Sequence, residues 1–178
     1  MSIRVTLHKL ENAGPKQTKI TNEACQLLEQ ALNHVSFHQR VTESEFTASW
    51  QRVRGEGSSE RTPEEIAQLI LMGQEANTDA DYEIDLHLRL KKLRSWVIGS
   101  TALGRLPITT NYKFINRWIR ENDSASFAAH IMHEWMHVAG FYHKGGNGAR
   151  GDVAYVIGGI VYDVITEEIF DQSEAELI

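Results

Sequence analysis

One short segment constrains this chain more than any other: residues 130–146 read HIMHEWMHVAGFYHKGG and hold four of its eight histidines. Side chains four residues apart lie on the same face of an α-helix, so His133 and His137 would stand side by side. A helix that continued would carry His143 away from them, but Gly140 can adopt a left-handed conformation, end the helix and turn the chain back. The spacing therefore predicts a helix, a turn at Gly140 and three converging imidazoles.

Three converging imidazoles form a typical ligand set for Zn²⁺ and leave its fourth position open to water. Glu134 is offset from His133 by about 100° around the helix, so it lies beside the ligands rather than among them. A carboxylate in that place can take a proton from the water as general base and pass it on as general acid. We interpret His133, His137 and His143 as zinc ligands and Glu134 as the catalytic base. His130, one turn earlier, could line the same cleft.

The segment resembles the metzincin zinc-peptidase signature H-E-x-x-H-x-x-G-x-x-H and matches all of its fixed positions, with His133, Glu134, His137, Gly140 and His143. The resemblance implies a twisted sheet with a long backing helix after the first strand, then an edge strand bordering the cleft, one more strand and the active-site helix. It also implies a bound Zn²⁺ and the hydrolysis of a protein or peptide substrate by an endopeptidase. The chain departs from the family at one point: family members carry a methionine in a tight turn beneath the metal, and no methionine follows His143 here.

The segment GDVAYVIG, residues 151–158, is the candidate replacement for that turn. We expect it to form a tight floor beneath the three histidines. The Tyr155 hydroxyl would then lie near the open coordination position and could stabilise an oxyanion, which makes Tyr155 a second candidate catalytic residue. The alternative for Tyr155 is a tyrosine packed in the core with its hydroxyl bonded to the backbone.

Two alternative functions remain open. Asp152 and Tyr155 form a D-x-x-Y pair that resembles the downstream motif of aspartate-liganded zinc peptidases, although that assignment would leave the spacing of Gly140 and His143 unexplained. The second alternative is a zinc-stabilised binding module without catalysis. Glu134 counts against it, because a structural zinc site needs no base and usually closes its fourth position with a protein ligand. The ligands alone are also compatible with a hydrolase that acts on a non-peptide amide.

The rest of the chain predicts an α+β fold, with a twisted mixed β-sheet, a backing helix, an active-site helix and a compact C-terminal part. With 178 residues and 42% hydrophobic content, we expect a single domain over residues 1–178. The clearest strand is 82–90, where Tyr82, Ile84, Leu86, Leu88 and Leu90 alternate with polar residues.

The other expected elements follow from local patterns. Strands are expected at 3–7, 96–101 and 111–119, with two more inside 35–53, and helices at 21–34, 63–72, 124–139 and 160–170. The helix at 63–72 has a capping box in Thr62 and Glu65, with proline at the first helical position. Residues 54–62 are expected to be an exposed linker, and a glycine-rich break is expected at 145–151.

The composition of the chain limits the binding partners and the cellular location that we expect. A net charge of −6 with both signs mixed along the chain leaves no basic stripe, which argues against nucleic acid or an anionic membrane as a partner. The single cysteine, Cys25, excludes an internal disulfide and is expected to be a small buried hydrophobe. We find no signal peptide and no apolar run of transmembrane length, so cytoplasmic residence is the default, with signal-free export as the alternative. The sequence does not indicate an oligomeric state.

Overall fold

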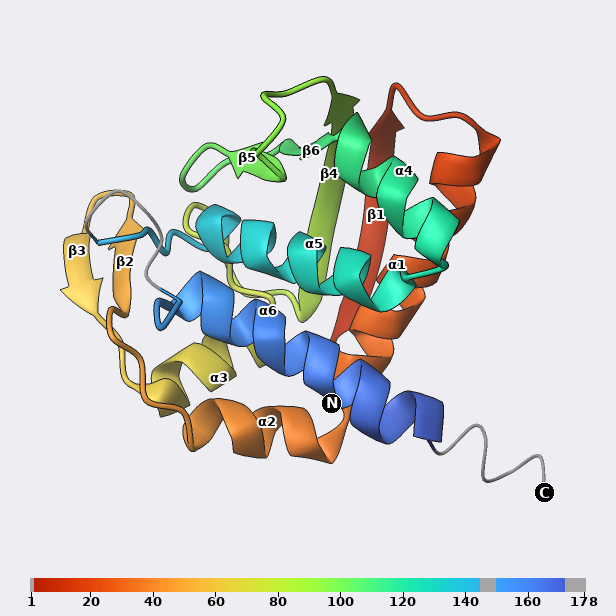
Figure 1. Cartoon of the computed structure of the whole chain (residues 1–178). Coiled ribbons are helices and arrows are strands. Elements are labelled where there is room, and N and C mark those ends of the chain that lie inside the picture. Colours follow the sequence, from red (N-terminus) through yellow and green to blue (C-terminus); the bar gives the residue numbers. More distant parts are fainter. Residues whose placement is uncertain (1, 145–149, 172–178) are drawn as a thin grey trace.

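The structure, a computed structural model, describes residues 2–144 and 150–171. Within these residues the chain has the expected α+β fold, with a mixed four-stranded sheet and a separate two-stranded hairpin (Figure 1). The strands are β1 (Arg4–Glu11), β2 (Trp50–Val53), β3 (Gly57–Glu60), β4 (Glu83–Lys91), β5 (Gly99–Thr101) and β6 (Ile108–Asn111). The helices are α1 (Pro15–Asn33), α2 (Val35–Thr42), α3 (Pro63–Leu71), α4 (Tyr112–Glu121), α5 (Ser124–Val138), α6 (Val153–Asp163) and the π-helical η1 (Val164–Ile169).

The sheet has the strand order β1-β4-β6-β5. β4 pairs in parallel with β1 and with β6, whereas β5 runs antiparallel to β6 and forms the edge of the sheet. β4 is confirmed as a strand, and its inward side chains Ile84, Leu86, Leu88 and Leu90 are all fully buried. Tyr82 does not belong to that face: it precedes the strand with a φ of +62° and is 40% exposed.

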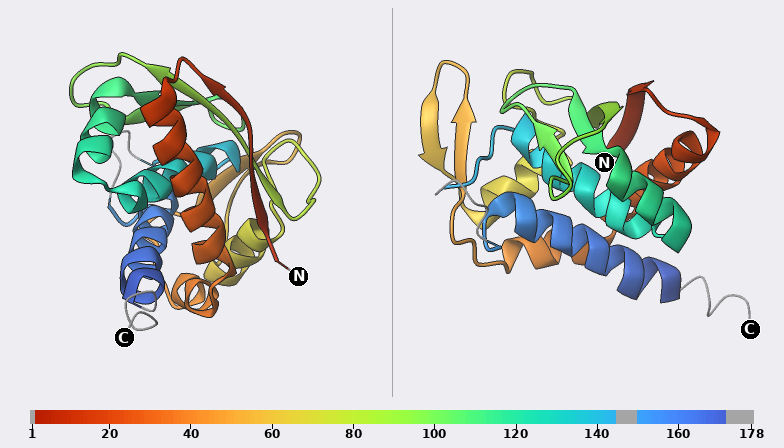
Figure 2. Two further views of the ribbon diagram at one scale, coloured as in Figure 1. Left: turned by 90° about the vertical axis from the view of Figure 1, so that its right-hand side faces the viewer. Right: turned by 45° about the horizontal axis from the view of Figure 1, so that its top comes forward.

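The helices build a layered core on one side of the sheet. α1 packs on β1 and on α5, and α5 also contacts β5 and β6. α6 lies along α5 on the side away from the sheet, as Figure 2 shows from two further directions. Cys25 is buried in α1, as expected. Because α5 is covered by α1, α6 and the sheet, its position is well determined by packing.

Residues 35–42 were expected to be a strand and are instead helix α2. Phe37 and Val41, one helical turn apart, are both fully buried, and the side chain of His34 caps the helix by accepting a hydrogen bond from Ser36 N. This i, i+4 pair is a helical pattern, so the strand prediction was wrong for this segment.

The expected strand at 111–119 is also a helix, α4. Ile115 and Trp118 are its buried residues, and the Asn111 side chain accepts a hydrogen bond from Lys113 N at its start. The strand that precedes the histidine-bearing helix α5 is β6, which lies mostly in the segment expected to be a connection. The expected order of edge strand, one further strand and histidine-bearing helix is therefore present, with α4 inserted before α5.

Several other elements differ from the sequence-based expectations in their type or in the residues where they begin. Residues 54–62 contribute to an exposed hairpin of β2 and β3 rather than a linker. α1 begins at Pro15, earlier than expected, and α3 has the predicted capping box. α6 begins at Val153 and not near residue 160. Most of the glycine-rich break falls at 145–149, outside the described residues. Within the described parts of the chain, no helix is long and apolar enough to cross a bilayer.

Candidate metal centre

Helix α5 and the turn after it position the histidines. Asp123 caps the start of the helix, because its carboxylate accepts a hydrogen bond from Ser126 N, and the last helical residue is Val138. Gly140 has a φ of +96°, and a Cβ at this position would lie 2.4 Å from the carbonyl oxygen of Arg52. Only glycine fits both the conformation and the space. The predicted helix and the predicted turn at Gly140 are therefore confirmed.

The turn brings His143 back to the two histidines of the helix. One ring nitrogen from each of His133, His137 and His143 lies within 4.8 Å of the others. The ring centroids are 4.8–5.4 Å apart. A tetrahedral Zn²⁺ with Zn–N bonds of about 2.0–2.1 Å holds its nitrogen ligands about 3.4 Å apart, so small side-chain rotations suffice to close this triad around one ion.

Hydrogen bonds to Nδ1 of His137 and His143 leave the Nε2 atoms of these two rings available to a metal ion. Nδ1 of His137 lies 2.7 Å from the carbonyl oxygen of Phe141, and Nδ1 of His143 lies 3.2 Å from a carboxylate oxygen of Asp152. Both partners accept, so both Nδ1 atoms must donate in these contacts. In the neutral rings Nε2 then carries the lone pair that can bind a metal.

Burial keeps the two helix histidines neutral. It lowers the pKa of His133 to about 3, and the neighbouring histidines act in the same direction. Burial is also the largest cause of the lowered pKa of His137, with the hydrogen bond to Phe141 opposing it. A neutral imidazole is the form that coordinates a metal ion.

Asp152 stands behind His143 and outside the histidine triad. The residue is only 2% exposed, and its side chain also accepts a hydrogen bond of 3.2 Å from Thr47 Oγ1. It therefore orients the His143 ring from the side away from the other two histidines. The sequence had offered Asp152 as an alternative third ligand, but the donor group within 4.8 Å consists of the three histidines.

Glu134 points toward the edge strand. It is 5% exposed, and its Oε2 accepts a 2.7 Å hydrogen bond from Thr101 Oγ1 on β5. Burial raises the pKa of Glu134, and the hydrogen bond from Thr101 works against that rise. A Cβ at Gly99 would lie 2.8 Å from Oε1 of Glu134 and 2.4 Å from the ring of His130, so the strand backbone approaches the site closely at this glycine.

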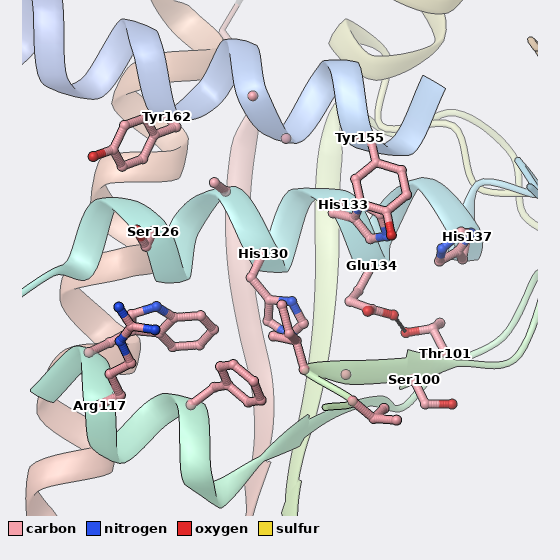
Figure 3. Close-up of a pocket in the computed structure, with 18 of the residues that line it drawn as sticks. Ser100, Thr101, Arg117, Ser126, His130, His133, Glu134, His137, Tyr155 and Tyr162 are labelled. Carbon is pink, nitrogen blue, oxygen red and sulfur yellow. Dashed lines mark hydrogen bonds between the residues drawn. The ribbon is translucent and has the colours of Figure 1, made fainter. Parts of the chain in front are cut away.

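Tyr155 belongs to the site but not in the expected way. It lies in the first turn of α6, so the expected tight turn over 151–158 is wrong from Val153 onward. Its ring packs against two rings of the triad, with centroid distances of 4.5 Å to His133 and 5.0 Å to His143, and Figure 3 shows it reaching from α6 toward α5. The alternative of a core tyrosine is also wrong, because the residue is 43% exposed.

These groups open onto one cleft of about 810 Å³. The segment 96–101 forms one wall, and α4, α5 and α6 form the others. His130 lines this cleft, as anticipated, with Nε2 3.1 Å from Thr110 Oγ1, and burial lowers its pKa to about 3. Thr101 and Gly99 escaped the sequence analysis, because a hydroxyl or a glycine in a short polar strand carries no signal until its partner is known.

A second group of possible ligands lies on the outer face of the sheet, formed by His8, Glu83 and Asp85. His8 is largely exposed, and Glu83 is paired with Arg4 at 2.9 Å. The Arg4 guanidinium already neutralises Glu83 and so disfavours a cation at this place. We therefore interpret the three residues as part of a set of surface ion pairs across β1 and β4.

Comparison with models of protein families, with curated proteins and with solved structures finds no match to this chain.

Proposed function

We propose that this protein is a zinc-dependent endopeptidase with a metzincin-like active site. The observation that carries the proposal is the convergence of His133, His137 and His143 beside a buried glutamate, at the bottom of a cleft bordered by a sheet edge. A purely structural zinc site has no use for a glutamate held beside the ligands or for an open cleft above them.

The donor set suits Zn²⁺. It offers three imidazoles, and in His137 and His143 a hydrogen-bond partner on Nδ1 leaves Nε2 available to a metal ion. When bound, the metal supplies a Lewis acid that polarises the scissile carbonyl and lowers the pKa of water. Asp152 and the carbonyl oxygen of Phe141 keep the ligand rings in orientation.

Glu134 would act as the general base and then as the general acid. Its Oε2 is held by Thr101, which leaves Oε1 free to accept the proton of the attacking water and to deliver it to the leaving amine. Burial raises its pKa, which favours uptake of a proton by this carboxylate. Tyr155, over the ligand rings, is the candidate hydrogen-bond donor to the oxyanion that develops on the substrate carbonyl.

The edge strand favours a polypeptide as the substrate. β5 pairs with β6 on one side, and its residues line the cleft beside Glu134. An extended peptide can add to such an edge by backbone hydrogen bonds, which would place its carbonyl groups along the histidine triad. A small non-peptide amide would not form such backbone hydrogen bonds with β5.

Hydrolysis of an unfolded protein tests the proposal. The chain loaded with one equivalent of zinc should cleave reduced, unfolded casein, and removal of the metal with a chelator should abolish cleavage until zinc is restored. Zinc binding without any cleavage of polypeptides would instead support a zinc-stabilised binding module.

A further inference from the structure

Positive charge is concentrated in one segment of this acidic chain. Residues 91–120 contain seven Lys and Arg residues and no Asp or Glu, whereas the whole chain has 24 acidic and only 18 basic residues. The segment includes the edge strand β5 and helix α4, which both border the cleft. This part of the surface therefore carries an excess of positive charge, although the chain as a whole is negative.

Four of these cations surround the loop that leads from β4 into β5. We call them the basic rim: Lys91, Lys92, Arg94 and Lys113. All four are exposed, and Figure 1 shows the loop and α4 at the same end of the molecule. Within residues 2–144 and 150–171, none of the four forms an ion pair with a carboxylate, whereas Arg117 on the same segment is paired with Glu121. The basic rim therefore offers charge to a partner from outside.

Hydrogen bonds from a buried asparagine fix the backbone of this loop. Asn111 is 2% exposed, and its Nδ2 donates to the carbonyl oxygens of Arg94 at 3.1 Å and of Val97 at 2.7 Å. Lys113 Nζ donates to the carbonyl oxygen of Ser95 at 2.9 Å. The loop backbone is thus ordered before any partner binds, which lowers the entropic cost of forming a complex.

The basic rim continues directly into the cleft. The Arg94 guanidinium lies over the ring of Trp96, 5.9 Å from its centroid. Trp96 is 72% exposed, and it lines the cleft together with Ile98. Exposed aromatic residues beside Arg are typical of protein-binding surfaces. A polypeptide that lies along β5 would pass Trp96 and reach the basic rim.

We infer that the basic rim binds acidic side chains of a polypeptide substrate, several residues away from the scissile bond. The inference rests on the proposed function, because the histidine triad defines where that bond would lie. It names a substrate class: polypeptides with a run of Asp or Glu on one side of the cleavage site. A chain with a net charge of −6 repels such a substrate overall, and the basic rim guides it to the cleft.

The position of the basic rim favours a polypeptide over other anionic partners. The rim leads into β5, whose outer edge can pair with an extended peptide. A short acidic run needs only the rim itself. A membrane surface or a nucleic acid would bring many negative charges close to the acidic remainder of the chain, which opposes binding.

Binding of short peptides tests the basic rim separately from catalysis. The full chain, kept free of zinc so that it cannot cleave them, is titrated with fluorescent peptides of one central sequence. They carry a run of glutamate, glutamine or lysine on the N-terminal or the C-terminal side. In one of the two orientations, the glutamate peptide should bind at least about tenfold more tightly than the glutamine peptide, because several exposed ion pairs act together. This preference should shrink between about 50 and about 500 mM NaCl, since salt screens exposed charges.

The matched variants remove the same number of positive charges from two places. The rim variant carries Lys91→Gln, Lys92→Gln and Arg94→Gln. The control variant carries three changes at exposed positions outside the cleft and outside residues 91–120: Arg4→Gln, Lys19→Gln and Arg54→Gln. The rim variant should bind the glutamate and glutamine peptides about equally and, with zinc bound, lose the preference in kcat/KM for the glutamate peptide. The control variant should keep both preferences, and thermal unfolding checks that both variants fold.

The outcomes separate the two proposals. Equal binding of the glutamate and glutamine peptides in both orientations, or a preference that persists in the rim variant, would overturn the assignment of the basic rim. Cleavage of both peptides with equal kcat/KM would overturn the rim and leave the peptidase standing. Selective binding of the glutamate peptide by a zinc-loaded chain that cleaves no polypeptide would support the rim and overturn the peptidase.

Two further probes distinguish the other anionic partners. Vesicles of phosphatidylcholine with phosphatidylserine, and a single-stranded DNA of mixed sequence, are measured with the unchanged chain and with the rim variant. Both should bind more weakly than the glutamate peptide. If either one bound more tightly, and the rim variant lost that binding, the basic rim would serve a lipid surface or a nucleic acid and the assignment to an acidic polypeptide would be wrong.

Discussion

Nδ1 of His143 lies 3.2 Å from Oδ2 of Asp152, a carboxylate buried at the start of α6. The contact joins the turn after α5 to the start of α6, and it leaves Nε2 of His143 free to face the other two rings. Carboxylates in this relation to a ligand histidine typically change metal affinity about 10–100-fold. In the proposed zinc site, Asp152 is therefore a positioning residue for His143.

Asp152→Ala should accordingly weaken zinc binding by about 10–100-fold, while Asp152→Asn, which keeps an acceptor oxygen, should weaken it less. His143→Ala should remove most of the bound zinc. Metal content after competition with a chelator of known affinity measures all three variants. If His143→Ala retained zinc and Asp152→Ala lost it completely, Asp152 would be the third ligand.

Glu134→Gln separates metal binding from chemistry. The amide keeps the shape of the side chain and can still accept a hydrogen bond from Thr101, but it cannot act as a base. Zinc content and thermal stability should persist while kcat/KM for a peptide substrate falls at least about 100-fold. Near-normal activity of the Glu134→Gln variant would remove Glu134 from the mechanism.

Thr101 should matter through the orientation of Glu134. Thr101→Val preserves volume and removes the 2.7 Å hydrogen bond to Oε2. We expect kcat to fall about 2–10-fold with zinc affinity unchanged, which corresponds to the loss of one ordinary hydrogen bond. Thr101→Ser keeps the donor and should restore most of the rate. Equal loss in both variants would mean that packing, and not the hydroxyl, is responsible.

Tyr155→Phe tests the oxyanion role. The ring contacts with His133 and His143 would remain, so zinc affinity should change little. Turnover should drop about tenfold or more if the hydroxyl stabilises the developing charge, with a smaller effect on KM. Unchanged turnover would limit Tyr155 to packing over the ligand rings.

A stability prediction concerns the outer face of the sheet. Glu11 accepts hydrogen bonds from Arg89 at 2.7 Å and from His87 at 2.6 Å, and these partners, with Lys9, hold its pKa well below the usual range. Its folded pKa is lower than its unfolded value of about 4.3, so the stabilisation is complete above that value and is lost as the pH falls toward the folded pKa.

Urea unfolding of Glu11→Gln should therefore show a lower free energy of unfolding at pH 7 and a flatter dependence on pH in the acid range than the unchanged chain. Glu60→Gln, at an exposed position of β3, is the control and should leave both properties in place. A pH dependence that is identical in Glu11→Gln and in the unchanged chain would refute the assignment.

The sequence predicted the local part of the site because short-range geometry governs it. Helical periodicity places His133 and His137 on one face, and a glycine that alone tolerates a φ of +96° turns the chain toward His143. The same local logic predicted α3 from its capping box and β4 from its alternation. It failed at residues 35–42 and 111–119, where a few apolar positions fit both a strand and a helix until packing selects the buried face.

The other features of the site were decided by the tertiary structure, because these features depend on contacts between segments that are distant in the sequence. The hydrogen bond from Thr101 to Glu134 joins residues 33 positions apart, and it exists only because the edge strand β5 crosses beside α5. Likewise, Tyr155 reaches the triad only because α6 packs along α5. The sequence by itself determined the candidate ligands and base through backbone geometry over a few residues. The orientation of those groups and the shape of the cleft followed from how the sheet edge and the helices pack together, which no local pattern records.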